Sequence, residues 1–421
     1  MPDNDGPGTA VLIADRIIDG LGGGPDEASA LVLDGGLIKD VIPKSQAVGR
    51  GLGPVLEYPG ASILPGLIDC HTHTNMPGNG RRGEDVNAED DDELRLARSF
   101  RNVRIALETG VTTLCDNGAW NDLGFRLKAE LNSGTVLGAD VLACGNPITI
   151  RKGHCWFMGS EVSGPEEARA KAREHLASGA DFLKAMTTGG STLGSRPYAA
   201  AFRLEELEAI TGAAREGGVY TVGHARCSAG IDMAVDAGFS MIAHCVFAAP
   251  DESYLFDQAV AEKLVAKGAW INPTLAIWES RLRLLKEKAE AQELTEEERQ
   301  DVTKGENAVR ERIDECGRLR DMGAKFVAGS DCGWGAYPFG YFVREIEALA
   351  RAGLTPMEAL MSGSSEAARA LNISDRVGTL ESGKQADVLV VNGDPSKDPS
   401  SLTDVAAVFK RGRPVERRLT A

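Results

Sequence analysis

Short apolar segments alternate with amphipathic ones along the central part of the chain, from residue 63 to residue 365. Apolar runs bounded by turn residues are typical of buried strands, and apolar residues three or four positions apart are typical of helices covering a sheet. The pattern predicts eight strands, each followed by enough chain for a helix: residues 67–73, 112–118, 140–145, 181–188, 219–225, 241–245, 270–275 and 326–333. Eight strand–helix units predict an α/β protein with a (β/α)8 TIM-like barrel, and a flat doubly wound sheet is the main alternative.

Two other regions have a different pattern. Residues 8–60 contain short β-type runs broken by Gly and Pro, and the same texture returns from residue 376 onward. Between the seventh and eighth predicted strands, residues 280–322 form an unusually long and charged stretch. We expect one or two surface helices there, whose charged residues do no more than face solvent.

The composition narrows the class of protein and its partners. The chain has 421 residues and is 43% hydrophobic and 26% charged, as expected of a globular protein. Its net charge of −16 argues against a phosphate-binding surface, so we expect no nucleic-acid partner. No run of 18 apolar residues occurs, so no membrane contact is expected. The N-terminus MPDNDGPGTA lacks the pattern of a signal peptide, and the eight scattered cysteines suit reduced, buried thiols, which together predict a cytoplasmic protein.

Polar residues gather at the ends of the predicted strands, where barrels of this kind carry their chemistry. GLIDCHTHT, residues 66–74, places His71 and His73 two positions apart, so both imidazoles point to the same side of one strand. His224, His244 and Asp331 end later strands. A single histidine at a strand end is usually a hydrogen-bonded core residue, but four of the six histidines at one rim predict a metal site.

Lys184 lies among apolar neighbours in the fourth predicted strand, FLKAM. A buried lysine is costly unless it is neutralised or paired. Three explanations are open: an ion pair with Asp181 or with a neighbouring strand, a Schiff-base lysine, or carbamylation by CO2, which converts the amine into a carboxylate that can bridge two metals. The surrounding histidines favour carbamylation.

Several segments together resemble a known family. PGLIDCHTHT, DFLKAMTTGG, TVGHA, MIAHC, AGSDCG and GTLESGKQADVLVVNGDP are similar to motifs of the amidohydrolase superfamily, specifically its imidazolonepropionase-like and prolidase-like metal-dependent amidases. The resemblance implies a barrel over residues 63–365 and a small β-sandwich domain built from residues 1–62 and 366–421. It also implies a homo-oligomer, since relatives commonly assemble.

The resemblance assigns the metal ligands to positions of this chain. His71, His73 and Asp331 would hold a first divalent ion, His224 and His244 would hold a second, and carbamylated Lys184 would bridge them. Zinc is the expected metal, because imidazole and carboxylate ligands with an open position suit it. The implied reaction is hydrolysis of a C–N bond by metal-bound hydroxide, with Asp331 moving the proton to the leaving nitrogen.

Two further residues are expected to act in catalysis and substrate binding. His154 follows the third strand in a long loop, where prolidase-like relatives carry a histidine that donates to the carbonyl oxygen; the alternative is a surface histidine. Tyr198 resembles the position where relatives place a phenol near that carbonyl. Arg151 and Lys152 depart from the usual motif before Gly153, and they are either substrate-facing or solvated. His175 lies on an amphipathic helix and is expected to be structural.

Loop aromatics predict a pocket for an apolar or aryl group, with Trp156 and Trp334 as substrate-binding candidates. Arg196 and Arg226 are candidates for binding a substrate carboxylate through a bidentate fork. Arg226 stands where relatives often have a histidine, which puts a standard prolidase-type substrate in doubt.

These features predict a binuclear zinc amidohydrolase that acts on a small molecule such as an N-acyl amino acid, a dipeptide or an aryl amide or carbamate. The first alternative is a cyclic amidase or an aminohydrolase of the same superfamily. Deaminases typically use one metal and lack the strand-four lysine, so Lys184 weighs against deamination. A non-catalytic metal-binding homologue is the second alternative, and Asp331 argues against it because such a protein needs no acid–base group.

Overall fold

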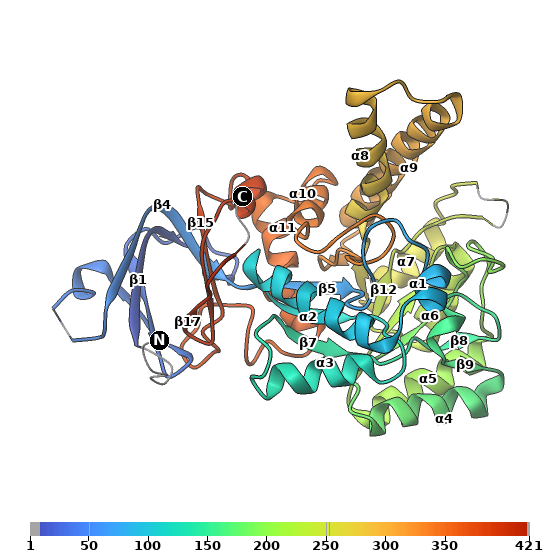
Figure 1. Ribbon diagram of the computed structural model, residues 1–421, viewed down its shortest axis with the longest axis horizontal. Coiled ribbons are helices and arrows are strands. Elements are labelled where there is room, and N and C mark those ends of the chain that lie inside the picture. Colours follow the sequence, from blue (N-terminus) through green and yellow to red (C-terminus); the bar gives the residue numbers. More distant parts are fainter. Residues whose placement is uncertain (1–8, 50, 250, 252, 419–421) are drawn as a thin grey trace.

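The computed structural model describes residues 9–49, 51–249, 251 and 253–418. The first eight residues, which contribute to the expectation about a signal peptide, lie outside them. The described chain is a mixed α/β protein, as predicted, with a β-rich part formed by both ends of the chain and a larger part of alternating strands and helices (Figure 1). Among the described residues, no helix combines the length and apolar content needed to span a lipid bilayer.

All eight predicted central strands are present, each somewhat shorter than expected. They are β5 (Leu67–Thr72), β6 (Val111–Asp116), β7 (Asp140–Ala143), β10 (Phe182–Ala185), β11 (Tyr220–His224), β12 (Met241–Ala243), β13 (Trp270–Asn272) and β14 (Lys325–Phe326). Several strands end earlier than predicted because the residues expected at their ends have non-extended backbone conformations, as at His244 and Asp331.

The central strands pair in parallel as a three-stranded sheet, β5-β6-β7, and a five-stranded sheet, β10-β11-β12-β13-β14. Backbone hydrogen bonds join the two sheets at both seams. At one seam the Ile148 amide donates to the Lys184 carbonyl over 2.8 Å, and at the other the His73 amide donates to the Cys332 carbonyl over 2.8 Å. The strands therefore follow one another around a ring, an arrangement consistent with a TIM-barrel-like domain.

Helices lie around the outside of this ring, apart from α8 (Leu275–Ala291) and α9 (Glu296–Asp321), which project from it (Figure 1). The others are α1 (Gly83–Glu89), α2 (Asp92–Glu108), α3 (Leu123–Asn132), α4 (Gly164–Ala177), α5 (Leu204–Gly217), α6 (Ser228–Ala237), α7 (Gln258–Lys267), α10 (Val343–Arg351), α11 (Pro356–Ser362) and α12 (Ser365–Ala370). Their ends follow local rules. Helix α7, for example, is capped at its start by Asp257, whose carboxylate accepts from the Val260 amide, and is followed at its end by Gly268 with φ +70°.

The charged stretch 280–322 belongs to two helices, α8 and α9, which project from the rest of the molecule as a hairpin (Figure 1). The hairpin is attached at its base, where the buried Glu345 carboxylate of α10 accepts from the amides of Leu275 (3.0 Å) and Ala276 (2.7 Å). Helix N-termini favour a carboxylate in this position. Even so, burial raises the pKa of Glu345 to about 8.

The interior of the ring is filled by side chains at the N-terminal ends of the strands. Phe182 and Tyr220 stack there with ring centroids 4.9 Å apart. Ile68 and Val327 belong to the same buried cluster, and so does Leu371, which directly follows α12. Because this end is packed with apolar groups, any polar site must lie at the opposite ends of the strands.

Strands from both ends of the chain form one seven-stranded sheet, ordered β17-β16-β15-β4-β1-β2-β3. The long strand β4 joins the two halves, since it pairs with β1 on one side and with β15 on the other. The two halves face each other as layers in Figure 1, with Leu12, Ile63 and Phe409 among the buried residues between them. The strands are β1 (Ala10–Ile17), β2 (Ser29–Asp34), β3 (Leu37–Pro43), β4 (Val55–Pro65), β15 (Val388–Asn392), β16 (Val405–Lys410) and β17 (Arg413–Pro414).

The remaining elements are short. Strands β8 (Thr149–Ile150) and β9 (Glu161–Val162) pair with each other, and the 3-10 helices are η1 (Lys44–Gln46), η2 (Trp156–Met158) and η3 (Pro399–Thr403). The eight cysteines are all buried and free, as the sequence predicted.

Lys410 attaches the terminal sheet to the central strands. Its buried ammonium donates to Asp387 (2.6 Å) and to the Thr112 carbonyl (2.8 Å), and it lies 2.9 Å from Asp140 of β7. Burial by itself would raise the pKa of Asp140, but Lys410 and Arg411 hold that pKa below its usual value.

We predict that Lys410→Met lowers the free energy of unfolding by about 3–5 kcal/mol, because it leaves two carboxylates without their buried cation. Chemical denaturation followed by circular dichroism measures this change. The matched control is Lys39→Met, which removes an exposed ion pair with Asp34 and is expected to change stability by no more than about 1 kcal/mol. Equal effects of the two substitutions would contradict the role of Lys410.

Candidate functional site

One cavity of about 520 Å3 opens at the C-terminal ends of the central strands. The residues predicted as metal ligands all line it: His71, His73, Lys184, His224, His244 and Asp331. They come from β5, β10 and β11 and from the segments that follow β5, β12 and β14. All six side chains are buried, with exposed fractions between 1% and 7%. Residues up to 260 positions apart in the sequence are thus brought to one place by the ring of strands.

His71, His73 and Asp331 form the first group. The Asp331 Oδ1 atom lies 3.3 Å from His73 Nε2 and 3.7 Å from His71 Nε2. Potential ligand atoms of the three residues lie within 4.8 Å of one another. No hydrogen-bond donor reaches Asp331 Oδ1 among the described residues, although the atom is buried. A buried carboxylate oxygen without a donor is costly, and a cation bound by this group would lower that cost.

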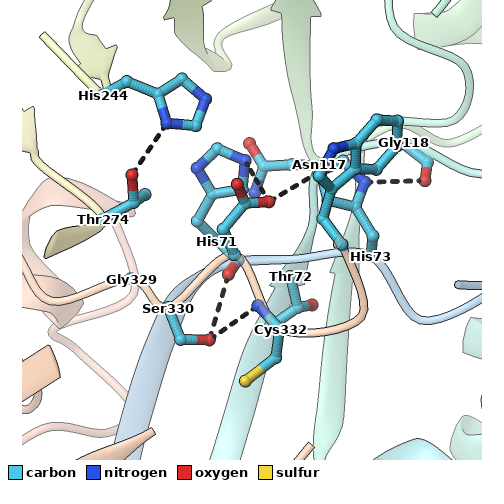
Figure 2. Close-up of polar contacts among 12 residues, drawn as sticks. His71, Thr72, His73, Asn117, Gly118, His244, Thr274, Gly329, Ser330 and Cys332 are labelled. Carbon is cyan, nitrogen blue, oxygen red and sulfur yellow. Dashed lines mark hydrogen bonds and ion pairs between the residues drawn. The ribbon is translucent and has the colours of Figure 1, made fainter. Parts of the chain in front are cut away.

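His224 and His244 form a second group beside the first. Their ring centroids are 4.4 Å apart, and the His244 centroid is 5.3 Å from that of His71. Figure 2 shows the His71, His73 and His244 rings arranged around the same space. Lys184 lies between the groups, with Nζ 3.4 Å from His71 Nε2.

Burial keeps these imidazoles neutral. Desolvation, together with the nearby Lys184 ammonium, lowers the pKa values of His71, His224 and His244 well below their usual range. A neutral imidazole cannot neutralise Asp331, but it can offer a lone pair to a cation. Several neutral imidazoles and one buried carboxylate oxygen are a donor set that fits a divalent metal ion.

Lys184 is buried and has no carboxylate partner within hydrogen-bond distance among the described residues. Its ammonium donates to Asn117 Oδ1 over 3.3 Å. Asp181 instead pairs with Lys128 over 2.7 Å, so the alternative of a Lys184–Asp181 ion pair is wrong. Burial lowers the pKa of Lys184 to about 8, although the nearby negative charge of Asp331 acts to raise it. The neutral amine, which is the form that reacts with CO2, is therefore accessible near neutral pH.

Neighbouring polar groups set the tautomers of the histidines. His71 Nδ1–H donates to Asn272 Oδ1 over 2.9 Å, and the Asn272 amide group donates in turn to the Gly329 carbonyl over 3.1 Å. This second bond fixes the orientation of the amide, so His71 keeps its proton on Nδ1 and presents the lone pair of Nε2 to the cavity. His73 Nδ1 likewise lies 3.3 Å from the Gly118 carbonyl, which can only accept, so His73 Nε2 also presents its lone pair.

The other two imidazoles are also held from outside the cavity. His244 Nδ1 lies 2.8 Å from Thr274 Oγ1 (Figure 2). His224 is turned the other way, because its Nε2 lies 3.1 Å from the Gly189 carbonyl, which can only accept; its free lone pair is therefore on Nδ1.

Backbone strain is concentrated at this rim. His244, Thr274 and Asp331 have φ values of +64°, +50° and +61°, a left-handed conformation that L-residues with a side chain rarely adopt. Such residues cost roughly 1–3 kcal/mol each and are typical of functional sites. Hydrogen bonds offset part of this cost: the Asp331 amide donates to the His71 carbonyl over 2.7 Å, and the His244 amide donates to the Asn272 carbonyl over 2.8 Å.

Of the residues expected to contact substrate, His154, Arg226 and Trp334 line the cavity. The His154 ring centroid is 4.7 Å from that of His224, and the Trp334 centroid is 5.1 Å from that of His73. His154 Nδ1 lies 2.8 Å from the hydroxyl of Thr192.

The remaining candidates lie outside the cavity lining. Trp156 is 39% exposed and packs edge-on against Phe157, and the Arg196 side chain is exposed. The Tyr198 hydroxyl is half-buried, 3.5 Å from a terminal nitrogen of Arg226.

The structure also shows where two cationic loop residues and one helical histidine lie. Arg151 pairs with Glu167 over 2.9 Å on the surface, and the Lys152 side chain is exposed. His175 is buried between the Cys144 carbonyl (3.0 Å) and the Ser160 hydroxyl (3.0 Å), as expected of a structural residue.

The sequence analysis missed one wall of the cavity. The hairpin of α8 and α9 contributes residues that include Ile277, Trp278, Leu282, Leu285, Lys304 and Ala308. The expectation that residues 280–322 only face solvent is therefore wrong for one face of the hairpin. The i, i+4, i+7 spacing of Trp278, Leu282 and Leu285 was the available signal, but many charged residues surround it in the sequence.

Asn272 and Thr274 were also missed, although both stand in the segment NPT, which begins at the last residue of the seventh strand, β13. Asp69 is a further supporting residue, because it accepts from the Ser330 amide over 2.9 Å and from the Ser330 hydroxyl over 2.5 Å, and so holds the segment that carries Asp331.

Comparison with known proteins identifies the family and relatives of the same fold. The profile of the Amidohydrolase family matches residues 62–415. Ochratoxinase from Aspergillus niger is 24% identical over 381 residues, covering 82% of this chain and 73% of that protein. Imidazolonepropionase from Desulfotalea psychrophila is 45% identical over 65 residues, which cover 15% of this chain and 16% of that protein. The crystal structure of a Xaa-Pro dipeptidase with bound methionine superposes with a TM-score of 0.84 at 24% identity, covering 97% of this chain and 100% of the other.

We predict that Asn272→Leu weakens zinc binding by about 10- to 100-fold, because His71 loses the acceptor that fixes its tautomer. Competition with a chromophoric chelator measures the affinity. Asn272→Asp is the matched control, since it keeps an oxygen acceptor for His71 Nδ1–H, and we expect a smaller loss. Wild-type affinity in Asn272→Leu would contradict this role.

Proposed function

The chain belongs to the amidohydrolase family, and we propose that it is a metal-dependent hydrolase that cleaves the C–N amide bond of a small molecule. The proposed substrates are N-acyl amino acids, dipeptides and aryl amides or carbamates. The observation that carries the proposal is the buried Asp331 Oδ1, which has no hydrogen-bond donor among the described residues and faces His71 and His73 across 3.3–3.7 Å. Such a group is stabilised by a bound cation and is placed to exchange a proton in the cavity.

We propose two divalent ions, with zinc as the metal. His71, His73 and Asp331 would hold one, His224 and His244 the other, and Lys184, carbamylated by CO2, would serve both. When bound, these ions would activate a water molecule and polarise the amide carbonyl. The position of Lys184, 3.4 Å from His71 and without a carboxylate partner among the described side chains, supports the shared role.

Side chains of this protein would carry out the proton transfers of amide hydrolysis. Asp331 would accept a proton from the attacking water and deliver it to the leaving nitrogen. Burial lowers the pKa of His154 to about 3, so this imidazole is neutral at physiological pH. Thr192 Oγ1 accepts from the Cys155 amide over 3.0 Å, and its hydroxyl would donate to His154 Nδ1, 2.8 Å away. His154 would then carry its own proton on Nε2 and donate it to the carbonyl oxygen of the substrate.

The architecture is part of the proposal. We assign residues 63–365 to a (β/α)8 barrel, supported by the hydrogen bonds at both seams of the ring. Residues 1–62 and 366–421 are assigned to a β-sandwich domain, supported by the facing layers of the terminal sheet.

A hydrolysis screen over N-acyl amino acids, dipeptides, aryl carbamates and anilides tests the function. We predict that Asp331→Asn lowers kcat/KM for the best substrate by about 10²- to 10⁴-fold, because the group that moves the proton is lost. Zinc content measured in parallel separates lost chemistry from lost metal. If neither the zinc-loaded wild type nor the variant hydrolyses any compound, the protein is a binding homologue and the proposal fails.

We predict that Lys184→Met reduces the zinc bound by bicarbonate-treated protein from about two ions per chain to about one, because the bridging ligand is removed. Elemental analysis after dialysis measures the content. Lys128→Met is the control, since Lys128 pairs with Asp181 outside the cavity lining. Two retained ions in Lys184→Met would exclude the bridging role.

A further inference from the structure

Arg226 occupies an unusual position in the cavity wall. Its guanidinium carbon lies over two aromatic rings, 5.4 Å from the centroid of Tyr198 and 5.1 Å from that of Trp278. Aromatic faces stabilise a guanidinium by cation–π contact and restrict its movement. The side chain is therefore positioned before any ligand arrives.

This cation has no acidic partner within ion-pair distance among the described residues. Its only side-chain hydrogen bond there is the 3.5 Å contact with the Tyr198 hydroxyl, and its Nε is buried without an acceptor. The other arginine of the cavity lining, Arg281, pairs with Asp301 over 2.5 Å. Buried Arg312, behind the wall, pairs with Glu315. A buried, unpaired guanidinium is costly unless an anion from outside completes it.

A second donor on the same wall also lacks an acceptor. Trp278 Nε1 is buried, and none of the described residues accepts from it. Trp278 and Arg226 are in contact and both line the cavity. Arg226 has no acidic partner, and its Nε–H and the Trp278 Nε1–H both lack acceptors among the described residues. These donors match a carboxylate, whose two oxygens can accept hydrogen bonds from both side chains.

The place of this wall relative to the imidazoles limits the ligand. Arg226 follows His224 by two residues, and His154 packs against His224 with centroids 4.7 Å apart. The anion would thus lie close to the proposed reaction centre. Farther along the same wall, Ile277, Leu282 and Leu285 of α8 provide an apolar surface. A matching ligand carries a carboxylate near its amide bond and an apolar group beyond it.

We propose that Arg226 and Trp278 form a carboxylate subsite, and that the substrate is an N-acyl amino acid or dipeptide with a free α-carboxylate rather than a neutral anilide or carbamate. This inference rests on the proposed amidase function, because the carboxylate is placed relative to the bond that is cleaved. The subsite itself can be tested by binding alone.

Calorimetry with zinc-loaded protein compares 3-phenylpropanoate with the isosteric neutral 3-phenylpropanamide. We expect the wild type to bind the carboxylate about 30-fold more tightly or better, and Arg226→Met to reduce this ratio to below about 3, because a buried charge partner is lost. Arg226→Lys, which keeps the charge but not the fork, should give an intermediate ratio. Trp278→Phe, which keeps a ring but removes the N–H, should lower the ratio by about 3- to 10-fold.

Arg281→Met is the matched control, since it removes a positive charge from the same cavity lining but one that is already paired. Its carboxylate-to-amide ratio should stay within about threefold of the wild type. No preference in the wild type, including binding of neither compound, overturns the subsite, and so does a preference retained in Arg226→Met. If Arg226→Met does not fold, as judged by circular dichroism, Arg226→Lys and Trp278→Phe decide in the same way.

Hydrolysis separates this inference from the proposed function. The zinc-loaded wild type is assayed on N-acetyl-L-phenylalanine and on its carboxamide, together with the compounds of the screen. A carboxylate preference in binding without hydrolysis of any compound would leave the subsite standing and refute the amidase. Hydrolysis with equal binding of acid and amide would leave the amidase standing and refute the subsite.

Discussion

The structure depends on one electrostatic constraint: a carboxylate, an amine and four imidazoles are buried together in a single cavity. Desolvation drives at least three of the imidazoles to their neutral form and makes the amine easier to deprotonate. Asp331 Oδ1 is left without a hydrogen-bond donor among the described residues. Neutral imidazoles and a buried carboxylate form a donor set that fits a divalent cation, whose binding would stabilise the cluster.

The fold meets this constraint by separating its two ends. The N-terminal ends of the strands hold a dense apolar core, which fixes the strands rigidly and excludes water. The opposite ends carry the strained residues His244, Thr274 and Asp331 and the hydrogen bonds that orient the imidazoles. Lys410 and Asp387 extend the support outward by holding the terminal sheet against β6 and β7. The contacts that stabilise the fold thus lie far from the rim. At the rim, the strained residues and the buried polar cluster reduce stability.

Much of this could be predicted from the sequence, because parallel strands in a ring place their C-terminal ends together. Two-residue spacing in His71 and His73, and polar residues at the ends of later apolar runs, were sufficient to predict the members of the cluster. The support of each ligand could not be predicted. Asn272 of β13 meets His71 of β5 although β14 lies between these strands in the ring, and Lys128 reaches Asp181 from helix α3, packed outside the ring. The hairpin wall was missed for the same reason, since its orientation depends on the contact of Glu345 with the start of α8.

The α8–α9 hairpin projects from the rest of the molecule (Figure 1), and some of its residues line the cavity. None of the side chains proposed to hold metal belongs to it. Insertions, deletions or replacements in this arm can therefore reshape the far end of the pocket without disturbing the chemistry at the strand ends. A chain built in this way can change the apolar group that it accepts in small evolutionary steps, because the apolar surface of this arm and the strand-end cluster are encoded in different stretches of sequence.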